Sequence, residues 1–273
     1  MVLPYQALAW FDEIGVQVGV TSELRDDGIR VVTMNHPPVN ALTVQGWFDL
    51  AEALDEAGRD DSTRVAVLRA EGRGFNAGVD IKEMQNTSGF DALIGANRGC
   101  YAAFKAVYEC PVPVVAAVHG FCLGGGVGLV GNADCIVAAD DAYLGVPEVD
   151  RGALGAATHL ARLVPPHLMR TLYLTGRTIR AADLVQHGSV LEVVPRDRLD
   201  EAALAVAGEI AAKDPRVVRM AKEALNAIDP VDVNRSYRFE QGFTMELNLS
   251  GVSDDLRDAF VDERGAGTET SKQ

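Results

Sequence analysis

Short apolar runs alternate with longer segments of helical spacing along the first two thirds of the chain. Runs rich in β-branched and small apolar residues predict strands at 16–20, 29–34, 65–70, 114–118, 135–139 and 190–194. Apolar residues that recur every three or four positions predict helices at 44–57, 90–108, 159–164, 167–174 and 179–186. Thr178 is expected to cap the last of these helices. The alternation predicts an α/β fold.

After about Pro195 the pattern predicts helices only, at 199–213, 216–227, 231–249 and 254–263. We therefore divide the chain into an α/β core at 1–195 and a helical region at 196–263, which is expected to pack on a neighbouring subunit. Residues 264–273 lack large apolar side chains and are expected to form a disordered tail.

One stretch, residues 113–148, combines the features of a catalytic site. It predicts a strand, a tight turn, three consecutive glycines at 124–126 that open a short helix, a second strand, and then Pro147 and Glu148. Glycines at a helix start let a ligand approach the backbone closely, and the free N–H groups there suit an oxyanion. A carboxylate that returns nearby would supply a base.

Composition excludes several classes of protein. The 273 residues carry a net charge of −14, which disfavours nucleic-acid binding. The N-terminus lacks the pattern of a signal peptide, and the glycines and prolines of the uncharged stretch 111–133 argue against a membrane span, so we expect a cytoplasmic protein. No cysteine lies in a CxxC pair, so a zinc site is not expected and buried free thiols are, at Cys100, Cys110, Cys122 and Cys135.

A dinucleotide site is the first alternative that the glycines raise. Gly126, Gly128 and Gly131 fit the pattern G-x-G-x-x-G. That fold needs the first glycine directly after the strand and a full-length helix behind it. Here five residues separate Val118 from Gly124, and barely two helical turns follow before the next strand. We therefore do not expect a nicotinamide or flavin cofactor.

Three segments together resemble the crotonase superfamily, which contains the enoyl-CoA hydratases and isomerases. They are Phe75-Asn-Ala-Gly-Val-Asp-Ile-Lys-Glu-Met84, Pro113-Val-Val-Ala-Ala-Val-His-Gly120 and Leu123-Gly-Gly-Gly126, and the resemblance extends over residues 15–263. It implies a ββα spiral core with a helical trimerisation region, and a homotrimer or a dimer of trimers. It also implies an acyl-CoA substrate, with no cofactor apart from the coenzyme A of the substrate.

The resemblance also implies the roles of individual residues. The main-chain N–H groups of Val79 and Gly125 would form an oxyanion hole for the thioester carbonyl. Fixed donors of this kind stabilise the charge that develops on an acyl-CoA enolate. The coenzyme A arm would lie along Ala41, Ala77, Val79, Asp80, Ile81 and Lys82. A solvated surface side chain is the alternative for Lys82.

The chain departs from the hydratase pattern at one of two glutamates. Glu148 matches the second, but Gly128 stands where hydratases carry the first. Water addition to an alkene uses one carboxylate to activate water and another to deliver a proton. A single glutamate is enough for double-bond isomerisation, or for hydrolytic cleavage of a C–C bond whose carbanion is held as an enolate.

The loop Pro147-Glu-Val-Asp-Arg-Gly-Ala-Leu-Gly-Ala-Ala-Thr-His-Leu160, together with Phe121-Cys-Leu-Gly-Gly-Gly-Val-Gly-Leu-Val-Gly-Asn132, resembles the ring-opening hydrolases of actinobacterial steroid catabolism. It adds Asp150, a candidate catalytic residue, and Arg151, a candidate substrate contact; a loop-stabilising ion pair is the alternative for both. We therefore expect hydrolytic C–C ring opening of a cyclic keto-acyl-CoA with Glu148 as the base. The alternatives are an enoyl-CoA isomerase, an enoyl-CoA hydratase and a non-catalytic CoA-binding scaffold. Structural roles are expected for His36, His119 and His159.

Overall fold

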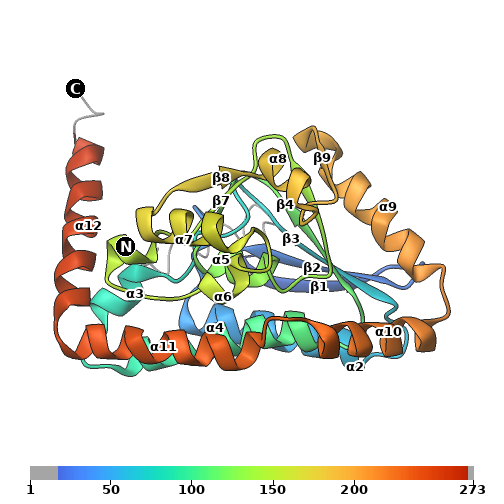
Figure 1. Cartoon of the computed structure of the whole chain (residues 1–273), viewed down its shortest axis with the longest axis horizontal. Coiled ribbons are helices and arrows are strands. Elements are labelled where there is room, and N and C mark those ends of the chain that lie inside the picture. Colours follow the sequence, from blue (N-terminus) through green and yellow to red (C-terminus); the bar gives the residue numbers. More distant parts are fainter. Residues whose placement is uncertain (1–17, 270–273) are drawn as a thin grey trace.

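A six-stranded sheet forms the centre of the computed structural model, which describes residues 18–269 (Figure 1). The strand order is β1-β2-β3-β4-β6-β9; β1 and β2 form an antiparallel hairpin and the other neighbours are parallel. The strands are β1 Gly19–Leu24, β2 Ile29–Asn35, β3 Val65–Ala70, β4 Val114–Val118, β6 Cys135–Ala139 and β9 Glu192–Val194. The α/β prediction is confirmed; the first residues of the predicted strand 16–20 lie outside the described part.

Successive side chains of the central strands enter two different hydrophobic cores, because they point to opposite faces of the sheet. Val67 faces α9 (Leu199–Ala211), while Leu68 faces the layer that contains α2 (Val44–Arg59) and α4 (Asp91–Glu109). The first helix of the predicted C-terminal region, α9, thus belongs to the core of the sheet.

A second sheet was not expected from the sequence. Its strands, in the order β5-β7-β8, are only three residues long, which is too short to show a period: Phe121–Leu123, Tyr143–Gly145 and Thr178–Arg180. The prediction that Thr178 caps a helix at 179–186 is wrong. Thr178 instead begins β8, which pairs antiparallel with β7, and α8 is limited to Ala181–Leu184.

The C-terminal helices lie along one side of the molecule and at one end of it. In Figure 1, α10 (Pro215–Ile228) and α11 (Val233–Leu249) follow one another beside α2 and α4, and α12 (Val252–Glu269) stands upright at the end. Residues 264–269, which were predicted to belong to a disordered tail, are thus part of helix α12. The remaining short helices are α3 Ile81–Asn86, α5 Gly125–Val130, η1 Pro147–Arg151, α6 Ala157–Leu160, α7 Pro166–Thr175, η2 Val185–His187 and η3 Arg196–Arg198.

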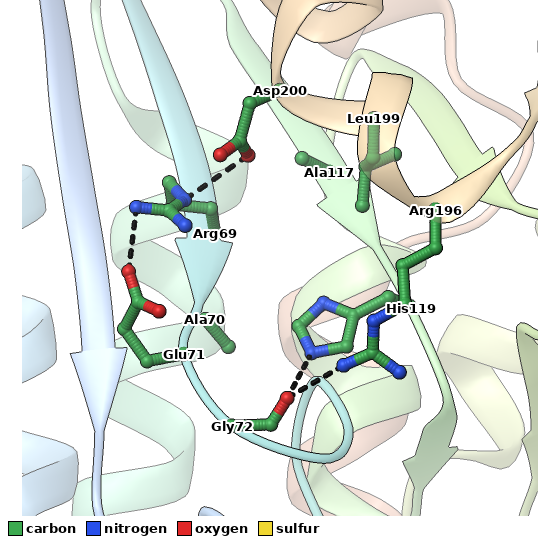
Figure 2. A pocket seen from close by; sticks show the side chains of 9 residues that line it. All are labelled: Arg69, Ala70, Glu71, Gly72, Ala117, His119, Arg196, Leu199 and Asp200. Carbon is green, nitrogen blue, oxygen red and sulfur yellow. Dashed lines mark hydrogen bonds and ion pairs between the residues drawn. The ribbon is translucent and has the colours of Figure 1, made fainter.

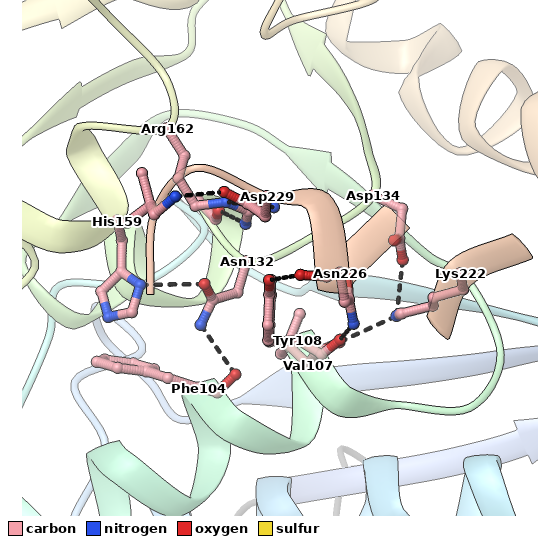
Figure 3. A network of polar contacts seen from close by, with 12 residues as sticks. Phe104, Val107, Tyr108, Asn132, Asp134, His159, Arg162, Lys222, Asn226 and Asp229 are labelled. Atoms are coloured by element: carbon pink, nitrogen blue, oxygen red, sulfur yellow. Dashed lines mark hydrogen bonds and ion pairs between the residues drawn. The ribbon is translucent and has the colours of Figure 1, made fainter. Parts of the chain in front are cut away.

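A buried ion pair fixes the docking of α10 (Figure 3). Lys222 is 3% exposed, and its Nζ donates to Asp134 Oδ2 at 2.8 Å and to the carbonyl oxygens of Val107 and Val112, both at 3.2 Å. Asp134 Oδ2 also accepts from the Val114 N–H at 2.7 Å. Since a buried ammonium is costly without such partners, these contacts set the register of α10.

The uncharged stretch 111–133 is divided among β4, β5 and α5, as its glycines and prolines indicated. None of the helices in the described range 18–269 is both long enough and apolar enough to cross a bilayer.

Candidate active site

Two buried asparagine side chains join the loop that carries Val79, one of the predicted oxyanion donors, to the loop around Asn40. Asn76, with no exposed surface, donates from Nδ2 to the Asn40 carbonyl at 2.6 Å and accepts the Gly78 N–H at 2.8 Å. Asn40 Nδ2 in turn donates to the carbonyl oxygens of Glu71 and Gly74, at 2.7 and 2.9 Å. The two loops lack regular secondary structure, and these side-chain bonds pair with their main-chain groups instead. The bonds therefore fix the geometry of the loops.

The predicted oxyanion donors lie on backbones that touch. The Leu42 N–H donates to the Gly78 carbonyl and the Asp80 N–H donates to the Leu42 carbonyl, so the bridge between these loops does not use the Val79 N–H. Gly125 is the first residue of α5, where an N–H has no acceptor within the helix. A Cβ on Gly78 would lie 3.4 Å from the Gly125 nitrogen.

The hydrogen bonds between these loops use neither N–H group, as the predicted oxyanion hole requires, and the role of the two groups stays a prediction. Only glycine fits this close approach. A Cβ on Gly125 would lie 2.7 Å from the Trp47 ring, and one on Gly126 would lie 2.9 Å from the Asn76 carbonyl oxygen.

The Glu148 carboxyl group lies against the same glycine loop. It comes from η1, and its Oε1 occupies the space that a Cβ on Gly124 would need. Gly124 has φ of +54°, which glycine adopts without strain. Oε2 is shielded from solvent and has no hydrogen-bond donor within the described part of the chain. The carboxyl group of the candidate base therefore lies against Gly124, the residue directly before the Gly125 N–H.

Burial raises the pKa of Glu148 to about 8, and the nearby Glu240 carboxyl adds to the rise. A main-chain hydrogen bond within the residue and the Arg151 charge act in the opposite direction. A carboxyl group with this pKa can take a proton from water and return it near neutral pH, which is the property of a general acid–base.

The position of the missing glutamate is filled by an aromatic ring. A Cβ on Gly128 would collide with the Phe104 ring, whose Cε2 and Cε1 would be 2.5 and 2.6 Å away. Phe104 is held by edge contacts with the rings of Trp47 and His159, with centroids 5.6 and 4.9 Å away. The space that a glutamate side chain at position 128 would need is thus occupied by a side chain of the core.

The other residues predicted along the coenzyme A arm follow the Asn76 loop. Asp80 caps α3, because its Oδ1 accepts the Lys82 N–H at 2.9 Å. Ala77 and Ile81 are half-buried, Ala41 is half-buried on the facing loop, and the Lys82 side chain is exposed. The structure therefore groups these residues beside Val79, and their contacts with coenzyme A stay a prediction.

The side chains of Asp150 and Arg151 contact different parts of the fold. Asp150 is exposed, and its Oδ2 lies where a Cβ on Gly176 would be, 2.6 Å away. The Arg151 guanidinium stacks over the Phe260 ring of α12, 3.7 Å from its centroid, and donates to the Asp150 carbonyl at 3.3 Å. Their catalytic and substrate-binding roles stay predictions.

A polar cavity of about 130 Å³ lies apart from these residues (Figure 2). Its side chains anchor the start of the oxyanion loop, because the Gly72 carbonyl accepts from Arg196 Nη2 at 2.6 Å and from His119 Nε2 at 3.2 Å. Burial lowers the pKa of His119, so the ring is neutral and donates through Nε2. This is the structural role expected for His119.

His159 is also structural (Figure 3). Its ring is buried, and Nδ1 lies 3.1 Å from Asn132 Oδ1, while Asn132 Nδ2 donates to the Phe104 carbonyl at 2.9 Å. Burial lowers its pKa to about 3. The four cysteines are free thiols, as predicted; Cys100, Cys110 and Cys122 are buried, while Cys135, which was also predicted to be buried, is half-buried.

Sequence reasoning missed the side chains that surround Glu148 from distant elements. They are Cys100 on α4, Tyr173 on α7, and Tyr237 and Glu240 on α11. No local pattern marks them, since each lies more than 20 residues from Glu148 in the chain.

Gly128→Ala tests the packing of the Phe104 ring. A helix normally gains about 0.5–1 kcal/mol from Gly→Ala, but the overlap with Phe104 should instead destabilise this variant by about 1–3 kcal/mol. Gly208→Ala in α9 is the matched control, since a Cβ there meets nothing within 4 Å and stability should rise. Urea unfolding measures both; equal effects would show that the ring does not occupy this space.

Comparison with known proteins agrees with this geometry. The family model described as Enoyl-CoA hydratase/isomerase matches residues 25–251. A protein of Rhodococcus jostii, named (7aS)-7a-methyl-1,5-dioxo-2,3,5,6,7,7a-hexahydro-1H-indene-carboxyl-CoA hydrolase, is 66% identical over 90% of this chain and 95% of its own. The protein of the same name from Mycobacterium tuberculosis is 67% identical over 89% and 98%.

The solved structures agree as well. The crystal structure of a probable enoyl-CoA hydratase from Mycobacterium thermoresistibile superposes with a TM-score of 0.76 at 31% identity, covering 85% of this chain and 98% of that one. Family match, relatives and fold thus lead to one conclusion: this chain belongs to the enoyl-CoA hydratase/isomerase family, the crotonase superfamily.

Proposed function

We propose that this protein is an acyl-CoA hydrolase that opens a carbon ring of a cyclic keto-acyl-CoA in steroid catabolism. The observation that carries the proposal is the buried carboxyl group of Glu148 beside the Gly124–Gly125 loop, with the Phe104 ring at the position where hydratases carry their first glutamate. The relatives of 66% and 67% identity are named for a CoA compound with two ketones on a fused ring, and we propose the same substrate class here.

The proposed reaction uses one residue as base and acid. Glu148 removes a proton from water, whose oxygen attacks a ring ketone. The C–C bond beside that ketone breaks, and its electron pair is delocalised onto the thioester oxygen as an enolate, which accepts hydrogen bonds from the Val79 and Gly125 N–H groups. Glu148 then returns the proton to carbon. The product carries a new carboxylate, and the thioester is retained.

The runner-up is an enoyl-CoA isomerase, which also needs one base. A hydratase is less well supported, because the second proton-transfer group that hydration requires is absent at Gly128. We propose that the reaction needs no cofactor beyond the coenzyme A of the substrate. Because CoA thioesters are made and used inside cells, we also propose a cytoplasmic location.

We further propose a homotrimer, alone or as a dimer of trimers, built on α10 and α11. These helices expose apolar side chains that a monomer would leave in water, at fractions of 41–76%. They are Val217, Met220, Leu225, Ile228, Phe239, Phe243 and Leu249.

Glu148→Gln should abolish ring opening. The amide keeps the size of the side chain but cannot accept a proton, so kcat should fall by about a thousandfold. Mass spectrometry of the acyl-CoA product, which gains one water, measures the reaction on a bicyclic diketone CoA thioester. Release of free CoA thiol would identify thioester hydrolysis, fast hydration of crotonyl-CoA would identify a hydratase, and an active Glu148→Gln variant would exclude this residue as the base.

The rate should rise with pH through the raised pKa of Glu148. Only the ionised carboxylate accepts a proton from water, and with a pKa of about 8 most of it is protonated at pH 6. We expect kcat/KM to fall about tenfold for each pH unit below that value. A profile that is flat between about pH 6 and pH 9 would contradict the role of a buried base.

The oligomer is tested by a charge placed on the apolar face. Wild-type protein should sediment at three or six times the mass of the 29.1 kDa chain. Met220→Glu with Ile228→Glu should lower that mass, because the two positions are 72% and 76% exposed in the single chain. Leu191→Glu, at a position 59% exposed outside these helices, is the control that should leave it unchanged.

A further inference from the structure

The segment 152–158 follows the short helix η1 that contains Glu148; it is irregular as far as Ala156 and then enters α6. It is attached to Glu148 through main-chain hydrogen bonds. The N–H groups of Gly152 and Ala153 both donate to the Glu148 carbonyl, the second at 3.0 Å. These two bonds therefore join the start of the segment to the residue that carries the candidate base.

Side chains from two helices take up the next N–H groups of the segment. The Leu154 N–H donates to Thr244 Oγ1 at 2.9 Å, and that hydroxyl donates back to the Leu154 carbonyl at 2.6 Å. The Gly155 N–H donates to the Tyr173 hydroxyl oxygen at 3.1 Å. The segment has no regular structure of its own, so these contacts determine its path.

Glu240 of α11 makes the last and most extensive of these contacts. Its Oε2 accepts the Ala157 N–H at 3.0 Å, and its Oε1 accepts the Thr158 N–H at 2.7 Å and the Thr158 hydroxyl. Ala156, just before this pair, has φ of +61°, a left-handed conformation that is strained for a non-glycine residue. The two N–H bonds to Glu240 hold the chain in that conformation.

Glu240 also places a second acidic group near Glu148. Burial raises the pKa of Glu240, while its hydrogen bonds from Thr158 and Ala157 favour the ionised form. Other titratable groups that face this pair are Arg151 of η1, Tyr173 of α7, and Cys100 and Tyr237 of α4 and α11.

We propose that Glu240 is a positioning residue for the reaction. It fixes the segment 152–158 beside Glu148 through the N–H groups of Ala157 and Thr158, and its charge acts on the base across the buried site. This inference rests on the proposed function, because it assigns a role relative to the base of the ring-opening reaction. Glu240 itself contacts neither the oxyanion donors nor the bond that breaks in the proposed reaction.

Glu240→Gln in the full-length protein tests the inference by steady-state kinetics from about pH 6 to pH 9 with the bicyclic diketone CoA thioester. The NH2 group of the new side-chain amide would face the main-chain N–H of Ala157 or Thr158, and two donors cannot form a hydrogen bond. The segment would then be held less firmly, so kcat/KM should fall about tenfold or more. Loss of the negative charge should ease ionisation of Glu148, so the rising limb of the profile should move to lower pH by about half a unit. A purely structural role would leave this limb in place.

Two further variants keep the test decisive. Thr158→Val removes one hydroxyl donor and keeps the Glu240 charge, so kcat/KM should fall without a shift of the limb, even if Glu240→Gln does not fold. Glu246→Gln, on the exposed side of the same helix, is the control that should match wild type. An unshifted limb in Glu240→Gln, or full activity in Thr158→Val, would overturn the inference. Failure of wild-type protein to open the ring would instead overturn the proposed function.

Discussion

The site depends on the direct contact between two backbones, that of Gly78 and that of the Gly124–Gly125 turn. Two N–H groups can serve one oxyanion only if the loops that carry them approach more closely than side chains allow. Glycine removes the steric barrier, but it also leaves both loops entropically costly to fix. The buried Asn76 side chain offsets part of that cost for the Gly78 loop, because it bonds to the Asn40 carbonyl and the Gly78 N–H at once.

Near this contact an aromatic ring stands where hydratases carry their first glutamate. The Phe104 ring fills the volume at Gly128, and it is in turn enclosed by Trp47, His159 and Tyr237. A carboxylate cannot be restored there without moving an aromatic cluster. Glu148 is buried beside this cluster, and burial raises its pKa to about 8, so one residue can serve as base and acid.

The C-terminal helices contribute side chains to the surroundings of Glu148 and also to the molecular surface. Helix α11 sends Tyr237, Glu240 and Thr244 toward the segment behind Glu148, and α12 sends Phe260 under the Arg151 guanidinium. The same α11 exposes Phe239 and Phe243 on its other side. A single helix, α11, therefore contributes both to the surroundings of Glu148 and to an exposed apolar face.

The sequence by itself determined the α/β class, the helical C-terminal end and the positions of the glycine loop and Glu148. Each rests on a local pattern: strand and helix periods, consecutive glycines, and a motif whose residues are neighbours in the chain. It did not determine the three-residue strands such as β8, which exist only because β7 lies alongside to accept their hydrogen bonds. Nor did it determine what occupies the space at Gly128 or which side chains face Glu148. Those contacts join residues far apart in the chain, and only the tertiary packing of α4, α7 and α11 brings them together.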